Sequence, residues 1–336
     1  MTRARLFAAA RIAVTAALLV WAFHRVDARG LAAALRGAHA GWLAGAAAAG
    51  LAGSLISTAR WSVLLHAQGI RLPFARLLRL FLAGVFFSMF LPSAMGGDAA
   101  RMALLAPSLR RREVAVSSVL ADRMVGLAAM VVMALAAAAF TPSLRRSPQV
   151  MGSVALVAAA FAAGLALLGS RGAAARLARL LPRRAARLME SPARRVYGSL
   201  VSFARAPRAL TAAFLLAFAL QVSACAAVAC AGLAFGVPVP VLAYFALVPV
   251  VSACTALPIS VNGWGVQDSL FVALFGVAGA SASQAALLSL FQHALRNAVG
   301  LLGGLAFLLG RPGRPEPGDA GAAIPAIEEA VEGGAR

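Results

Sequence analysis

The 336-residue chain is 62% hydrophobic and 12% charged, with a mean hydropathy of +0.86, whereas a soluble domain carries about 25% charged residues. Because so apolar a chain cannot cover its own surface in water, the composition excludes a soluble globular protein and predicts an all-α, polytopic transmembrane helical bundle. All 31 basic residues behind the +20 charge are arginines, and they lie between apolar runs. That placement indicates loops facing anionic lipid and no nucleic-acid partner.

The candidate membrane spans follow from apolar runs of about 20 residues. The first, 5–23, has a basic start but no small-residue cleavage site after it, so we interpret it as a retained helix. The further full-length candidates are 42–59, 116–140, 150–170, 209–235 and 285–309. Three shorter apolar pieces are 77–91, 241–257 and 266–277.

Arginine-rich segments set the predicted orientation in the cell inner (plasma) membrane, with both termini cytoplasmic. Within the membrane domain 1–310, segment 171–208 is rich in arginine and predicts a cytoplasmic basic amphipathic helix on the membrane surface. The tail 311–336 is rich in Pro, Gly and Glu, which predicts disorder on the cytoplasmic side.

Two apolar segments are interrupted by proline and glycine. The first, 77–106, carries FLPSAMGGDAAR (90–101); helix 42–59 returns the chain to the cytoplasm at Arg60, Arg71 and Arg76, and arginines 110–112 follow. Since both flanks are cytoplasmic, the segment is predicted to re-enter as a hairpin. The second, 241–277, carries LPISVNGWGVQD (257–268) and is predicted to enter from outside. Two broken hairpins of opposite orientation predict an inverted repeat with a site between them. The alternative is two pairs of full spans with short loops.

Three acidic residues lie at membrane depth: Asp98, Asp122 and Asp268. A charge there costs roughly 2.5–3.5 kcal/mol of insertion free energy. Asp98 is a candidate N-cap for a half-helix starting at Ala99, with or without a further function. Arg101, beside that helix N-terminus, suits an anionic group such as phosphate; the alternative is an arginine that extends to the surface. Asp122 and Arg123 cannot face each other on one helix, so we group them with Arg60 as structural intramembrane pairs.

The last helix carries His293 and Arg296 at i and i+3, with Arg296 midway along the span. The motifs GWLAG (41–45) and GLLGG (300–304) predict close helix packing. No catalytic residue set, metal-ligand cluster or cofactor motif is visible. The candidate headgroup-binding residues are Pro92, Gly96, Gly97, Asp98, Arg101, Asn262, Gly263, Gly265, Asp268 and Arg296.

Four motifs in order carry a resemblance to a known family: RWxxLLxxxG (60–69), FxxxFLPSxxGGDxxR (86–101), ADRxVGL (121–127) and PISxNGWGVQD (258–268). Over roughly residues 5–310 the chain resembles the lysylphosphatidylglycerol synthase transmembrane family of flippase-like proteins. The resemblance implies lipid movement between leaflets and re-entrant segments at the centre. The second family motif commonly reads Gly-x-Gly-x-Arg-Glu; here Gln267 and Asp268 stand in the last two places. Fused members carry a soluble aminoacyltransferase domain that this chain is too short to hold, so we expect no such activity.

The expected function is therefore a lipid translocase that moves a phosphate-bearing lipid between leaflets. Two alternatives stay open: a non-catalytic membrane scaffold for a lipid or glycan synthase, and an ion-coupled small-solute transporter. The expected partner is a membrane lipid with an anionic headgroup. The possible protein partners are a second copy of the chain and a separate lipid or glycan synthase.

Overall fold

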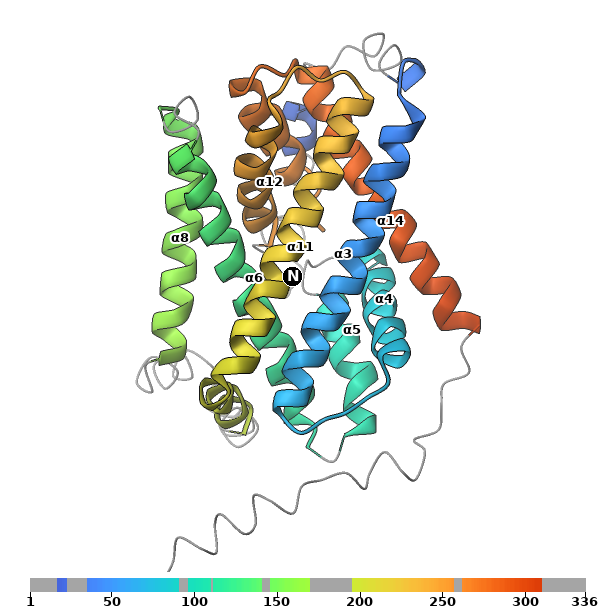
Figure 1. The fold of residues 1–336 in the computed structure, drawn as a ribbon, viewed down its shortest axis with the longest axis vertical. Coiled ribbons are helices and arrows are strands. Elements are labelled where there is room, and N and C mark those ends of the chain that lie inside the picture. The colour runs from blue at the N-terminus through green and yellow to red at the C-terminus, as the bar shows by residue number, and fades with distance from the viewer. Residues whose placement is uncertain are drawn as a thin grey trace, which may run out of the picture.

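The computed structural model describes residues 17–22, 35–90, 96–109, 111–140, 146–169, 195–256 and 262–309. Within these ranges every regular element is helical and no strand occurs, which confirms the predicted all-α fold (Figure 1). Pro92, the predicted tail 311–336 and residues 171–194 of the predicted amphipathic segment lie outside the described residues. Of that segment, 195–202 are helical, and its last two residues already belong to the following helix.

The helices in chain order are α3 (Ala40–Ala67), α4 (Phe74–Phe90), α5 (Gly96–Leu105), α6 (Glu113–Phe140), α8 (Pro148–Gly169), α11 (Pro207–Ala234), α12 (Val241–Ala256), α13 (Val266–Leu270) with a π-helical turn (Phe271–Phe275), and α14 (Ala282–Leu309). Among the described helices, α3, Glu113–Ala136 of α6, and α11 are long and apolar enough to cross a membrane. The chain is therefore built as a membrane-embedded helical bundle.

Helix α3 departs most from its predicted bounds. It was expected over 42–59 but continues to Ala67, so Arg60 lies buried inside the helix and not in a cytoplasmic loop. The apolar run stops at Arg60 because arginine is charged, but Asp122 neutralises that charge within the bundle. The helix ends where Gly69 adopts a φ of 77°, a left-handed conformation that glycine adopts without steric cost.

Helices α3 and α11 run antiparallel and define two ends of the molecule. At one end the amide of His39 donates to the carbonyl of Ala234 at 3.0 Å. At the other end Gln68 Nε2 donates to Ser202 Oγ at 2.8 Å. Each helix has 28 residues, a length of about 42 Å at 1.5 Å per residue. We call them the 39/234 end and the 68/202 end.

The two broken segments return to opposite ends of the molecule, as Figure 1 shows for α4–α5 and α12. At the 68/202 end Arg76, early in α4, donates to Ser108 Oγ just after α5 at 2.8 Å. At the 39/234 end Gln284 Nε2 lies 3.5 Å from the carbonyl of Gly236, so the flanks of α12–α13 also meet. The ten residues of α5 span about 15 Å, half a hydrocarbon core. Re-entry into a bilayer and the inverted repeat stay predictions.

The GLLGG motif lies against α4, as predicted. A Cβ at Gly303 would meet the backbone carbonyl of Leu82, and one at Gly304 would meet the ring of Phe86 at 2.5 Å. The packing at GWLAG is looser: a Cβ at Gly45 would make an ordinary 3.6 Å contact with Cys230 of α11. On α3 the close approach occurs instead at Gly50, against Leu295, because it is the facing helix that decides which glycine is needed.

Candidate functional site

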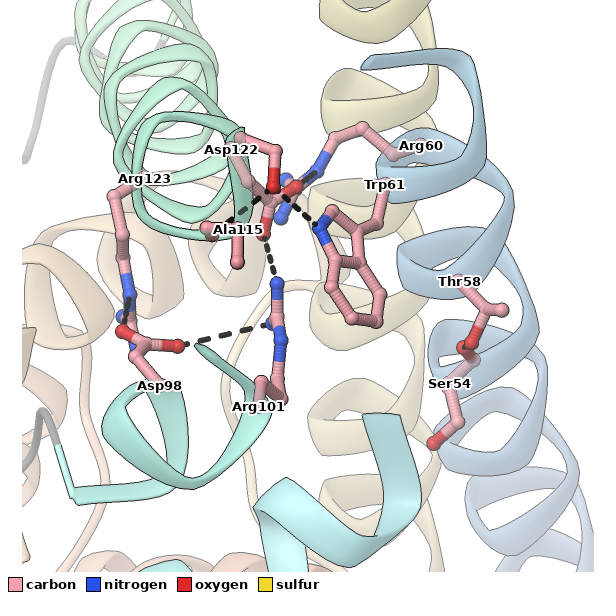
Figure 2. Close-up of polar contacts among 10 residues, drawn as sticks. Ser54, Thr58, Arg60, Trp61, Asp98, Arg101, Ala115, Asp122 and Arg123 are labelled. Carbon is pink, nitrogen blue, oxygen red and sulfur yellow. Dashed lines mark hydrogen bonds and ion pairs between the residues drawn. The ribbon is translucent and has the colours of Figure 1, made fainter. Parts of the chain in front are cut away.

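Five charged residues from three helices form one group, which we call the arginine–aspartate cluster (Figure 2). Helix α3 contributes one, α5 contributes two and α6 contributes two, so chain segments far apart in sequence meet here. Its members are Arg60, Asp98, Arg101, Asp122 and Arg123.

Each aspartate of the cluster contacts two arginines. Asp122 Oδ1 accepts from Arg60 Nε at 2.6 Å, and its Oδ2 lies 3.3 Å from Arg101 Nη2. Asp98 accepts from Arg123 Nε and lies 3.7 Å from Arg101 Nη1. Arg101 thus bridges α5 to α6, and the adjacent Asp122 and Arg123 pair with different helices.

The cluster holds one positive charge in excess, because three arginines face two aspartates. Four of the five side chains are less than 10% exposed, and Arg123 is the more open one at 42%. Arg101 Nε is buried without a hydrogen-bond partner. A buried donor without a partner costs about 1–3 kcal/mol, so the cluster has the charge and the donor to take up a further anionic acceptor.

Aromatic rings hold the guanidinium of Arg101. It lies 4.5 Å from the Trp61 ring centroid and 5.3 Å from that of Phe81. Gly84 of α4 leaves the room for its stem, since a Cβ there would meet Arg101 Cγ at 2.5 Å. With Arg101 only 5% exposed, the alternative of an arginine that extends to the surface is wrong.

The region around Asp98 corrects one expectation. The residue was expected to cap a helix starting at Ala99, but α5 already includes Gly96, so Asp98 lies in its first turn. There its carboxylate faces arginine side chains and not a free helix end. Neither Gly96 nor Gly97 has a positive φ; instead a Cβ at Gly97 would meet the carbonyl of Gly84 at 2.5 Å, so Gly97 serves the contact between α4 and α5.

A second group lies where the turn 262–265 meets α14. Asn262, Gly263 and Gly265 all have positive φ, at 49°, 83° and 80°, and the turn directs the carbonyl of Asn262 to Arg296 Nη2 at 3.1 Å. Asp268 is fully buried and accepts from Ser289 Oγ at 2.6 Å and from the amide of Gly265 at 2.9 Å.

His293 lies between Asp268 and Arg296. Its Nε2 is 3.3 Å from Asp268 Oδ1, and its Nδ1 is 2.8 Å from Arg296 Nη2. The imidazole stacks on Trp264 with ring centroids 3.8 Å apart. Asp268 contacts His293 and not Arg296, because α13 and α14 place the imidazole between the two side chains. We call Asp268, His293 and Arg296 the histidine relay.

A cavity of about 350 Å³ lies among α3, α4, α11 and α14. Its wall is mostly aliphatic and aromatic, and Ser54, Ser57, Gln292 and Arg296 supply the polar groups. Two of its polar atoms, Arg296 Nε and Gln292 Oε1, are buried without a hydrogen-bond partner. The cavity therefore combines apolar walls with unsatisfied polar groups, as a site for an amphipathic molecule does.

The cavity and the arginine–aspartate cluster are neighbours through one ring. Phe81 lines the cavity and also packs on the guanidinium of Arg101. Arg101 itself does not line it. The structure thus separates the two arginines predicted to share one headgroup: Arg296 lies in the wall, and Arg101 packs behind Phe81.

Residues 8–304 match the family described as lysylphosphatidylglycerol synthase TM region. The chain belongs to this family. No curated protein is similar enough to count as a match. As a family member with apolar spanning helices, it is a membrane-embedded protein related to lipid modification or translocation.

In this family member the site also contains residues that the sequence did not single out. Trp264 stacks on His293 of the histidine relay, whereas the i, i+3 spacing pointed to His293 and Arg296 alone. Gln292 and the α3 serines had no such signal, because polar side chains in a long helix look alike until the facing helix is known. Within the described residues no three His, Cys, Asp or Glu side chains come together as metal ligands.

Proposed function

We propose that the protein is a translocase that moves a phosphate-bearing lipid between the leaflets of the inner (plasma) membrane. The observation that carries the proposal is the cavity beside Arg296, whose Nε is buried without a partner. A guanidinium is a strong donor to phosphate oxygens, and apolar walls accept acyl chain. A phospholipid needs both a donor for its phosphate and apolar walls for its acyl chains in one place.

The size of the cavity limits what it holds at one time. At about 350 Å³ it lies at the small end of ligand sites, which run from about 300 to 1,000 Å³. It suits a headgroup or a stretch of one chain, with the rest of the lipid in the surrounding bilayer. Such partial enclosure fits transfer along the protein surface.

Arg101 offers the next positive group along the path. Its contact to Asp98 is the longest in the arginine–aspartate cluster, at 3.7 Å, and the cluster carries one excess positive charge. A phosphate that displaced Asp98 from Arg101 would leave Asp98 paired with Arg123. The headgroup would thus exchange with a carboxylate, once Phe81 moves aside.

The distribution of arginines supports the proposed orientation, with the 68/202 end cytoplasmic. Arg71, Arg76, Arg79, Arg111 and Arg112 are at or near this end. The described part of the 39/234 end carries Arg36 and Arg146. An excess of arginine in the cytoplasmic loops is the general rule for membrane proteins.

Reconstitution tests the proposal. We expect the purified protein to move fluorescent phosphatidylglycerol between leaflets of vesicles, and Arg296→Ala and Arg101→Ala to abolish the movement while the proteins still fold and insert. Arg111→Ala is the matched control, because that side chain is 62% exposed and lies outside both groups. Full transport by both alanine variants at wild-type expression would contradict the proposal.

A conservative variant adds a graded test. Arg101→Lys should restore only part of the transport, because a point charge replaces a planar fork that donates to two acceptors at once. A complete rescue would mean that charge alone matters at this position.

The same assay separates the other classes of function. A scaffold for a separate lipid or glycan synthase would show no lipid movement on its own, and an ion-coupled solute transporter would move solute without moving lipid. We also expect no aminoacyl transfer by this chain, since its described residues form an apolar helical bundle. Formation of lysyl- or alanyl-phosphatidylglycerol with charged tRNA would overturn that expectation.

A further inference from the structure

The hydrogen bond between Arg296 and His293 fixes the protonation state of the imidazole. A guanidinium carries only donors, so His293 Nδ1, 2.8 Å from Arg296 Nη2, must be an unprotonated acceptor. Because Nδ1 carries no proton, a neutral ring carries its single proton on Nε2, which lies 3.3 Å from Asp268 Oδ1 without a hydrogen bond. The imidazole is therefore neutral whenever Arg296 occupies this position, and Arg296 holds it neutral.

We propose that His293 is a proton-binding site whose protonation releases Arg296 into the cavity. A proton from water binds the Nδ1 lone pair, and Nδ1 becomes a donor that faces the Arg296 donor. The hydrogen bond between Arg296 Nη2 and Nδ1 then breaks. Nε2 stays 3.3 Å from Asp268 Oδ1, so the product is an imidazolium–carboxylate pair, and Arg296 keeps its hydrogen bond to the carbonyl of Asn262 as the guanidinium turns away from the imidazolium. Loss of the Nδ1 proton reverses the step.

The surroundings of His293 can hold either state. Asp268, from α13, is the acid that faces it, and Arg296, from its own helix, is the cation. The other close contact is the face of Trp264, which stabilises a cation above the ring. Helix α12, which packs on α13, carries no charged side chain. Asp268 and Trp264 therefore favour the imidazolium, whereas burial of the ring and the charge of Arg296 oppose it, so a change at Arg296 shifts the balance.

An anion in the cavity would supply that change. With neutral His293, Asp268 and Arg296 cancel, and protonation leaves one positive charge in a buried place. A phosphate bound to Arg296 both compensates this charge and draws the guanidinium away from Nδ1. Binding of the proton and of the anion must then strengthen each other by the same factor. The naming of the anion as a lipid phosphate rests on the proposed function; the proton site itself does not.

The tautomer can be measured directly. We expect the ¹⁵N spectrum of histidine-labelled protein in phosphatidylcholine nanodiscs to show neutral His293 with Nε2 protonated, assigned by its loss in His293→Gln. Addition of dioleoylphosphatidylglycerol should raise the pH at which His293 titrates. A ring that is protonated on Nδ1 at neutral pH, or a titration that the anionic lipid leaves unchanged, would overturn the proposal.

Lipid binding supplies the second readout. Affinity for phosphatidylglycerol vesicles should be about tenfold higher at about pH 5 than at about pH 8, with no such change for phosphatidylcholine. His293→Gln keeps a donor for Asp268 but cannot take up a proton, so its affinity should not vary with pH. His66→Gln, at an exposed histidine near the end of α3, is the matched control and should keep the wild-type dependence.

The outcomes separate this proposal from the proposed function. Lipid movement that persists while His293 stays neutral and binding is independent of pH contradicts the proton site alone. Proton-linked binding without any lipid movement supports the proton site and contradicts the translocase. A pH dependence that His293→Gln retains assigns the proton to another group and overturns the proposal.

Discussion

Asp122 is the residue on which the buried charges of α3, α5 and α6 depend most. It accepts from Arg60 and from Arg101, and both arginines are over 90% buried. Charges removed from water are costly unless paired, and the loss of one partner exposes the full cost of the other. The position of Arg101 in the proposed lipid path is therefore tied to a carboxylate that need not touch the lipid.

A double-mutant cycle tests this dependence. Asp122→Leu should destabilise the protein by about 3–5 kcal/mol because it leaves Arg60 without its acid. Arg60→Met should cost a similar amount, and the double variant should cost clearly less than the sum. Thermal unfolding in detergent measures all three. Additive losses would show that the two side chains act independently despite their 2.6 Å contact.

Most helices, but not all of their ends, could be predicted from the sequence. The segments 77–91, 116–140, 150–170, 209–235, 241–257 and 285–309 correspond to α4, α6, α8, α11, α12 and α14 within a few residues, because apolar length alone predicts a helix in a bilayer. The end of α3 was missed because a hydropathy count scores Arg60 as an unpaired charge that ends the span. In the structure Arg60 forms an ion pair with Asp122, and the helix continues. The π-helical turn after α13 has no sequence signal.

The site was predicted in part, for the same reason. Asp98, Arg101, Asp268 and Arg296 stood out as charges in apolar surroundings, and the structure places all four in polar groups. Their partners could not be read from the sequence, since contacts between helices depend on packing. The cavity depends on gaps between four helices and leaves no trace in any one of them.

Glycine contacts between α14 and α4 test the packing at the level of elements. Gly303→Ala should destabilise the protein by about 1–3 kcal/mol, because the added methyl would meet the backbone carbonyl of Leu82, which cannot rotate away. Gly152→Ala in α8 is the matched control: nothing lies within 4 Å of its added Cβ, so better helix propensity should stabilise it by up to about 1 kcal/mol. Melting temperatures in detergent compare the two, and equal effects would contradict the packing.

At the scale of the whole molecule, the two broken segments return to opposite ends of the helical bundle. The flanks of α4–α5 meet at the 68/202 end, and the flanks of α12–α13 meet at the 39/234 end. Arg36 lies at the latter end, close to His39 and the end of α11. If the bilayer normal follows α3 and α11, each broken segment enters and leaves on one side, and the two enter from opposite sides.

Cysteine labelling tests that topology. In a background without Cys225, Cys230 and Cys254, single cysteines at Arg71 and Arg111, both exposed, should react with an impermeant maleimide from the cytoplasm. Arg36→Cys, also exposed, should react from the other side, because α3 separates it from Arg71 by one crossing. The background protein must keep wild-type lipid movement for the comparison to hold. Labelling of Arg71→Cys and Arg111→Cys from opposite sides would mean that α4–α5 crosses the bilayer, and the proposed lipid path between the two broken segments would then have to be abandoned.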